Sequence, residues 1–301
     1  MTLGQWLPLW LRSYKLGTIK GTSYHQLEIL CQHIPENLKE TELSDILPMD
    51  LQVFFNEFAR ASSKSYMDKM RVLIHSLFCD ALDNGLCSRD PSKRLRIPHV
   101  SEHPREAFTM EEVSRIIGFA WGYPNVKIGT AILTLLLTGL RRGELLGLKW
   151  TDVDFDRRVV KVQRAISRQN GKVVEAPLKT KNAYRTLPLS ADAIDVLMQQ
   201  RRKTGNSEWV FPSPTGGPMS PDSVLHMLHR VLKRAGLPKV RFHDLRHTFA
   251  TLALQNGVDI KTVSGMLGHF SAGFTLDTYA HVTTDAQLKA AQTMGNILSR
   301  A

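Results

Sequence analysis

The stretch RDPSKRLRIPHVSEHPR, residues 89–105, divides the sequence into two parts. It contains three prolines and five Lys or Arg residues against two acidic residues, and its apolar residues follow no regular period. Proline restricts the backbone and stiffens an extended segment. The pattern therefore predicts a basic linker over residues 89–106 that joins two folded domains.

The part before this linker has the spacing of helices throughout. We expect helices over residues 2–14, 21–34, 48–61 and 63–84. In the last of these, Tyr66, Met70, Leu73, Leu77 and Leu82 fall close to one helical face, and Gly85 supplies a stop. Residues 1–88 are therefore predicted to form a small helical domain.

The part after the linker, residues 107–301, mixes helices with a short strand-rich region. Thr109-Met-Glu-Glu112 is a capping-box sequence that begins a helix, and Ser220-Pro221 is a favoured start for another. Residues 153–189 alternate like strands around a QNGK turn, and residues 285–298 form an amphipathic tail. The predicted fold class is mainly α with a small antiparallel β-sheet (α+β).

Composition limits the class of partner. Of 301 residues, 43% are hydrophobic and 22% charged, which is typical of a globular protein, and the net charge is +11. Such a charge favours a polyanion, either nucleic acid or an acidic membrane surface. The longest apolar stretch, residues 128–140, is shorter than the ~20 residues needed to span a bilayer. The three cysteines show neither disulfide nor zinc spacing, which is typical of a cytoplasmic protein.

Two motifs of the second part place basic residues beside turns. Thr138-Gly-Leu-Arg141-Arg142-Gly-Glu144 follows an apolar helix, so an arginine can be held at the start of the next helix. Its structural alternative is a surface Arg–Glu pair. Lys179-Thr-Lys181-Asn-Ala-Tyr-Arg185 lies where two strands would join in a hairpin, and a solvated basic loop is the alternative there.

Two further segments carry histidines. In Arg241-Phe-His243-Asp-Leu-Arg246-His247, His243 and Arg246 share a helix face and can grip one phosphate. His243 and His247 also have the spacing of a helical zinc site, but Arg246 places a fixed positive charge on that face and no third ligand is evident. Leu267-Gly-His269 and Thr278-Tyr279-Ala-His281 follow, and Tyr279 alone would suit a packed aromatic.

In this order, TGLRRGE, the Lys179 segment, HDLRHTFAT, LGH and TLDTYAH resemble the motifs of the tyrosine recombinase (phage integrase) family. The resemblance covers residues 107–290, and the preceding helices resemble that family's core-binding, SAM-like DNA-binding domain. It implies a site-specific DNA recombinase or integrase of a mobile genetic element, which breaks and rejoins DNA without metal, ATP or other cofactor. The sequence agrees, because it contains no Walker motif and no clustered carboxylates.

The resemblance implies that four side chains bind the phosphate. Arg141 and Arg246 would hold its non-bridging oxygens, and His243 and His269 would add hydrogen bonds. The TGLR pattern favours Arg141 over Arg142.

Two residues would carry the chemistry itself. Tyr279 would attack to form a 3′-phosphotyrosyl bond, and Lys179 would protonate the 5′-hydroxyl that leaves, with Lys181 as the alternative acid. His243 is the expected base for the phenol proton, and Glu144 is expected to orient Arg141. The predicted DNA contacts outside this group are Arg94, Arg96, Lys181 and Arg185.

Double-stranded DNA is thus the expected partner, and the family implies four protomers on two duplexes, with the tail after Tyr279 docked on a neighbour. DNA-bending or directionality proteins are compatible accessory partners, and no membrane association is expected. Two rival hypotheses are a catalytically silent DNA-binding regulator on the same scaffold and a metal-dependent nuclease that uses His243 and His247. The first predicts a missing catalytic residue, and none is missing.

Overall fold

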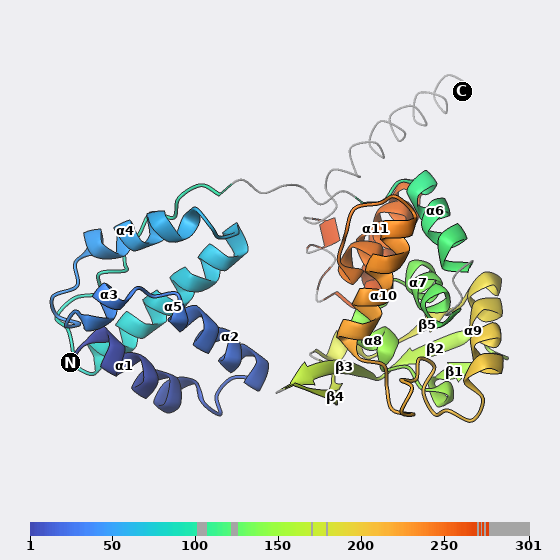
Figure 1. Cartoon of the computed structure of the whole chain (residues 1–301), viewed down its shortest axis with the longest axis horizontal. Helices are drawn as coiled ribbons and strands as arrows, with labels where there is room; N and C mark the ends of the chain where they lie inside the picture. The colour runs from blue at the N-terminus through green and yellow to red at the C-terminus, as the bar shows by residue number, and fades with distance from the viewer. Residues whose placement is uncertain are drawn as a thin grey trace, which may run out of the picture. The chain divides into compact units, whose positions relative to one another are not determined.

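A computed structural model of the chain describes residues 1–100, 107–121, 126–169, 171–178, 180–269, 271, 273, 275 and 276. The chain forms two compact units, Met1–Pro104 and Arg105–Ala301 (Figure 1). Each is described by itself. None of the helices in the described part of the chain combines the length and apolarity that crossing a membrane requires.

The first unit is helical, as expected. Its helices are α1 (Leu3–Trp10), which continues as a π-helical turn over Leu11–Lys15, α2 (Gly21–Gln32), α3 (Glu36–Glu40), α4 (Pro48–Ala59) and α5 (Lys64–Asp83). Helix α3 was not expected, because five residues show no helical period. Pro48 begins α4 at a position where its missing N–H costs no hydrogen bond.

Helix α5 provides much of the core of this unit. Met67, Met70, Ile74 and Leu77 are fully buried on it and pack within one cluster with the tryptophans of α1. The indole N–H of Trp6 donates to the Leu77 carbonyl at 3.3 Å, so an aromatic anchor also satisfies its polar atom.

The predicted linker begins as part of this unit. Pro91 and Ser92 are buried, and Leu95 packs against the helical core. The Gln52 side chain accepts from the Arg96 N–H at 2.9 Å and donates to the Arg96 carbonyl at 2.7 Å. Residues 89–100 are therefore attached to the first unit, which corrects the expected boundary at residue 88; residues 101–106 lie outside the described part.

The second unit contains seven helices among its described residues. They are α6 (Met110–Trp121), α7 (Val126–Thr138), α8 (Arg142–Leu146), α9 (Ala191–Thr204), α10 (Pro221–Arg234), α11 (Phe242–Gln255) and α12 (Ile260–Leu267). The expected helix starts are confirmed: Thr109 and Glu112 exchange backbone-to-side-chain hydrogen bonds of 2.9 and 3.2 Å, and Ser220 caps α10.

The strands form two antiparallel sheets where one was expected. The first has the order β1-β2-β5, from β1 (Val153–Asp154), β2 (Val159–Val162) and β5 (Arg185–Pro188); the second pairs β3 (Arg164–Gln169) with β4 (Lys172–Pro177). The segment after β4 therefore crosses between sheets and is not a hairpin loop, because β5 pairs with β2.

Helix α7 lies at the centre of the second unit. Ile128, Ala131, Ile132 and Leu135 are fully buried, and α7 packs against α6, α9 and α11. Figure 1 shows the β3–β4 ribbon at the edge of this unit, beside α8. The α+β class is confirmed, and α7, α11 and α12 bring their ends together at one place.

Candidate active site

Two arginines converge on the C-terminal end of α12. One guanidinium nitrogen of Arg246 donates to the Leu267 carbonyl at 2.7 Å, and one of Arg141 donates to the next carbonyl, that of Gly268, at 3.1 Å. The last carbonyls of a helix lack backbone partners and carry partial negative charge, so they attract cations. The helix end thus fixes two positive side chains beside each other.

Arg246 is the more deeply placed of the two. It lies on α11 and is only 2% exposed, and its second nitrogen donates to the Gly139 carbonyl at the end of α7 at 2.8 Å. Gly139 has a φ of +64°, and a Cβ there would lie 2.4 Å from a ring carbon of Phe249. Glycine is required at this turn, because an L side chain would meet both a left-handed backbone and the packed aromatic. The GLR sequence therefore has two roles. Its glycine supplies the carbonyl that holds Arg246, and its arginine is Arg141.

Glu144 fixes the orientation of Arg141. The carboxylate is 2% exposed and accepts from the Arg141 backbone N–H at 2.9 Å and from its guanidinium at 2.7 Å. Burial alone would raise the pKa of Glu144, but the hydrogen bond and charge of Arg185 and the charge of Arg141 leave its pKa below the usual value. Glu144 is thus a charged brace at neutral pH, as the sequence indicated.

Arg185, predicted to contact DNA, is engaged inside the protein. Its side chain is 8% exposed and donates to Glu144 at 2.9 Å, to the Met266 carbonyl at 2.7 Å and to the Ala183 carbonyl at 2.9 Å. These bonds connect β5 to the same end of α12 that holds Arg141. The geometry favours a positioning role for Arg185, which the sequence did not reveal because exposed and buried arginines look alike in a basic segment.

His269 follows the two carbonyls that the arginines hold. Its Nδ1 lies 2.7 Å from the hydroxyl of Thr275, which is fully buried. Partial burial and then the charges of Arg246 and Arg141 lower the pKa of His269 to about 4, so the ring is neutral at pH 7. Thr275 was missed in the sequence; its place four residues before Tyr279 is the only signal it offers.

His243 lies on α11 three residues before Arg246. Partial burial comes first, and the charges of His247 and Arg246 add to it, in lowering the pKa of His243 to about 4. The rings of His243 and His247 meet edge to face with centroids 4.8 Å apart. Asp244 points away to the start of the helix, where it binds the Arg241 guanidinium at 2.6 Å. The structure thus brings together Arg141, His243, Arg246 and His269. The charges of the two arginines help to lower the pKa of both histidines.

The remaining predicted residues are placed less completely. Lys179 and Tyr279 lie outside the described residues, as does the tail. Lys181 is exposed and begins a 3-10 turn, Lys181–Ala183, before β5. Arg142 donates to the Pro221 carbonyl at 3.3 Å, so the geometry favours Arg141 as the site arginine. Arg94 and Arg96 are exposed on the first unit.

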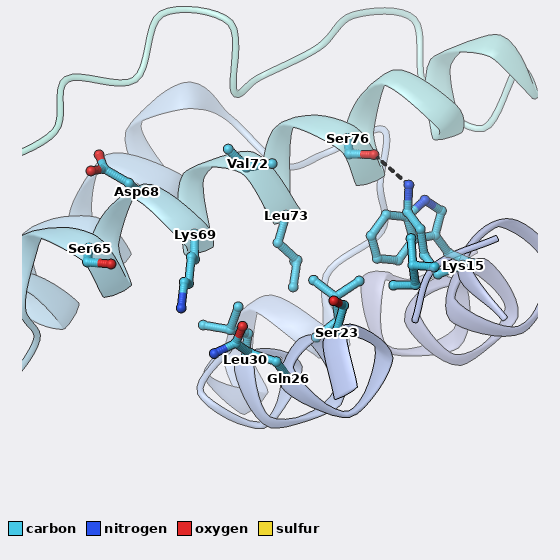
Figure 2. A pocket seen from close by; sticks show the side chains of 13 residues that line it. Lys15, Ser23, Gln26, Leu30, Ser65, Asp68, Lys69, Val72, Leu73 and Ser76 are labelled. Atoms are coloured by element: carbon cyan, nitrogen blue, oxygen red, sulfur yellow. Dashed lines mark hydrogen bonds between the residues drawn. The ribbon is translucent and has the colours of Figure 1, made fainter. Parts of the chain in front are cut away.

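A groove of about 480 Å³ lies between α2 and α5 of the first unit (Figure 2). Leu30 and Leu73 line its apolar part, and Lys69 extends from α5 toward α2. At one end, Lys15 donates to Ser76 at 2.9 Å. The groove therefore joins an apolar floor to cationic and hydroxyl groups.

Comparison with known families agrees with both units. Residues 106–285 match the model of the phage integrase family, and residues 2–59 match that of the phage integrase N-terminal SAM-like domain. A tyrosine recombinase XerC-like protein of Caldanaerobacter subterraneus subsp. tengcongensis is 29% identical over 332 residues, which cover 99% of this chain and 83% of the relative. Tyrosine recombinase XerA of Pyrococcus furiosus is 32% identical, over 69% of this chain and 68% of the relative.

Solved structures share the fold. The Tn1549 transposon integrase in complex with transposon right end DNA has a TM-score of 0.84 at 22% identity and covers 98% of this chain and 100% of its own. A lambda integrase tetramer bound to a Holliday junction has a TM-score of 0.72 at 22% identity, over 90% of this chain and 78% of its own. The chain belongs to the phage integrase family and is a tyrosine-type site-specific recombinase.

Proposed function

We propose that this recombinase cleaves and rejoins DNA through a covalent 3′-phosphotyrosyl bond at Tyr279. The observation that carries the proposal is the pair of guanidinium groups at the end of α12, where Arg246 and Arg141 hold consecutive carbonyls. Two fixed cations can bind the oxygens of one phosphodiester, whose transition state accumulates negative charge. Because hydrogen bonds within the protein already orient both guanidinium groups, these side chains need to move little when the phosphate binds.

His269 supplies a further donor to the same phosphate. We assign the Thr275 hydroxyl as the donor to Nδ1, which leaves the ring proton on Nε2. A neutral ring with a protonated Nε2 can donate to a non-bridging oxygen without adding a charge that the arginines would repel. The lowered pKa of His269 agrees with this neutral form.

Two proton transfers accompany the cleavage step. The Tyr279 oxygen forms the new bond to phosphorus as the bond to the 5′-oxygen breaks, and Lys179 gives that oxygen a proton. His243 takes the phenol proton. With a pKa of about 4 in the DNA-free protein, His243 is neutral and can accept a proton. The negative charge that develops on the phosphate in the transition state would raise the pKa of His243 as the proton arrives. Attack by a 5′-hydroxyl of another strand on the phosphotyrosine reverses the step and conserves the bond energy.

DNA binding would use both units. The first unit matches a SAM-like integrase domain and offers the groove beside Lys69 and the exposed Arg94 and Arg96. Four protomers on two duplexes are the assembly we propose, in line with the tetramer described for lambda integrase. Because the proposed substrate is DNA inside the cell, we expect the reaction to take place in the cytoplasm.

The test uses nicked duplexes that carry the DNA flanking this protein's own coding region, so that the cleaved end diffuses away and the adduct accumulates. Wild type should give a protease-sensitive, protein-linked DNA band on a denaturing gel in EDTA. Tyr279→Phe should give none, whereas Tyr24→Phe, which changes a partly buried tyrosine of the first unit, should keep the band.

Three results would overturn the proposal. An adduct that persists in Tyr279→Phe would place the nucleophile elsewhere. Strand breaks that form without a protein link and disappear in EDTA would support the metal-dependent nuclease, and specific DNA binding by wild type without any cleavage would support the silent regulator.

A further inference from the structure

Three side chains of metal-binding types meet on the first unit. His75 and Cys79 lie one turn apart on α5, and Asp90 reaches them from the segment that follows the helix. The Asp90 Oδ2 atom lies 3.1 Å from His75 Nδ1 and 3.9 Å from Cys79 Sγ, and Sγ lies 3.9 Å from the same Nδ1. Spacing along the sequence does not reveal the group, because the third member comes from an irregular turn.

These separations suit one zinc ion. Tetrahedral zinc with bonds of ~2.3 Å to sulfur and ~2.0–2.1 Å to nitrogen and oxygen keeps sulfur about 3.6 Å from each of the other two ligands, and nitrogen about 3.4 Å from oxygen. The observed distances of 3.9, 3.9 and 3.1 Å each differ from these by only a few tenths of an ångström. Small rotations of the exposed His75 side chain and of the partly exposed Cys79 side chain would close the difference.

The third side chain is already oriented. The other oxygen of Asp90, Oδ1, accepts from the Ser92 N–H at 2.8 Å and from its hydroxyl at 2.6 Å. The Asp90 side chain is 8% exposed, whereas His75 is half-exposed, so the carboxylate is fixed and the imidazole remains open to solvent. Hydrogen-bonded support of this kind orients ligands in known metal sites.

The local charge also favours a cation. The carboxylates of Asp90, Asp80 and Asp83 all act on the Cys79 sulfur through their negative charge. A bound divalent ion would offset this negative charge, and it would displace the thiol proton so that the sulfur binds as a thiolate.

We propose that His75, Cys79 and Asp90 bind one Zn²⁺ ion, with water as the fourth ligand. Bound zinc would fasten residues 90–92 to α5, at the start of the segment of residues 89–100 that packs on the helical core. The ion would stabilise the first unit and would take no part in the phosphodiester chemistry. This inference does not depend on the proposed reaction, because binding is measured without DNA.

The test is titration of the full chain, stripped of metal, with Co²⁺. Wild type should develop a near-ultraviolet thiolate-to-cobalt absorption that saturates at one ion per chain and is displaced by Zn²⁺. Cys79→Ser should abolish this band, and Asp90→Asn should weaken Co²⁺ binding by at least about tenfold. Cys31→Ala and His99→Gln, matched variants outside the cluster, should bind as wild type does.

A second measurement guards against misfolded variants. Zn²⁺ should raise the thermal midpoint of wild type and leave that of Cys79→Ser unchanged, while both show the same helical circular dichroism. Absence of the cobalt band in wild type would overturn the proposal. A band that survives in Cys79→Ser would overturn it too, because the sulfur would then come from another cysteine.

Discussion

The two units bury different kinds of side chain. In the described part of the first unit, the residues that are buried as a whole are apolar apart from Ser92, and tryptophan, phenylalanine and methionine fill the core. In the described part of the second unit, three charged residues are at most 4% exposed as a whole, Glu144, Asp152 and Arg246, and each has partners. Asp152, for example, pairs with Arg164.

This difference in buried residues separates a core that is explained by apolar packing alone from a site whose buried charges need another explanation. Burying a charge costs free energy even when it is paired, so stability alone favours an apolar replacement. Arg246 binds the end of α12, and Glu144 binds two arginines that contact the same end, which is the phosphate site we propose. The second unit therefore accepts a cost at this site that the apolar core of the first unit avoids.

The largest effect is expected from the apolar core of the first unit. Phe55→Ala removes a fully buried ring and should lower the free energy of unfolding by about 3–5 kcal/mol, measured in the first unit's urea transition. Val53→Ala changes a 51% exposed residue on the same helix and is the control. Equal losses in the two variants would mean that α4 does not pack as described.

Loss of the buried Arg246 guanidinium group should slow the reaction. Arg246→Lys keeps the charge but cannot reach the Gly139 and Leu267 carbonyls while also binding phosphate in a fork. The rate of covalent-adduct formation should fall ~10²–10³-fold. Arg115→Lys, on the exposed face of α6, should react at the wild-type rate. A wild-type rate in Arg246→Lys would remove Arg246 from the site.

A smaller effect distinguishes an internal brace from a DNA contact. Arg185→Met should slow adduct formation but leave the salt dependence of DNA binding unchanged, because the guanidinium faces Glu144. Lys181→Met should lower the slope of log affinity against log salt concentration by about 0.9, the value for one phosphate contact. A reduced slope in Arg185→Met would restore Arg185 as a DNA contact.

A pH dependence of the free energy of unfolding is expected in the second unit. The pKa values of His243 and His269 are lowered to about 4, so the unfolded chain binds protons near pH 6.5 and the folded chain only near pH 4. Their contribution to the free energy of unfolding is therefore full above about pH 7 and is lost as the pH falls toward 4. The variant His243→Gln with His269→Gln should show a flatter decline between pH 7 and 5 in urea unfolding; an unchanged decline would contradict these shifts.

Local signals in the sequence predicted the helices well. Gly21, Pro48 and the Ser220-Pro221 pair mark helix starts through backbone and capping preferences that act over a few residues. The apolar face of residues 63–84 predicted α5 to within a residue at each end. The grouping of Arg141, His243, Arg246 and His269 came from the resemblance of ordered motifs, not from spacing.

Features that depend on distant contacts were not predictable. The Arg185 bonds to Glu144 and Met266 join residues 41 and 81 positions apart, and no local pattern encodes them. The division into two sheets depends on β5 pairing with β2, and the packing of residues 89–100 depends on Gln52. In each case the contact forms only when the tertiary structure brings residues together that are far apart in the sequence.

The most direct measurement identifies the residue that carries DNA. The trapped wild-type adduct would be digested with protease and nuclease, and the peptide that retains a nucleotide would be sequenced by mass spectrometry. The account predicts a 3′-phosphate ester on Tyr279. A nucleotide on Tyr184, on a serine or on a histidine would contradict it.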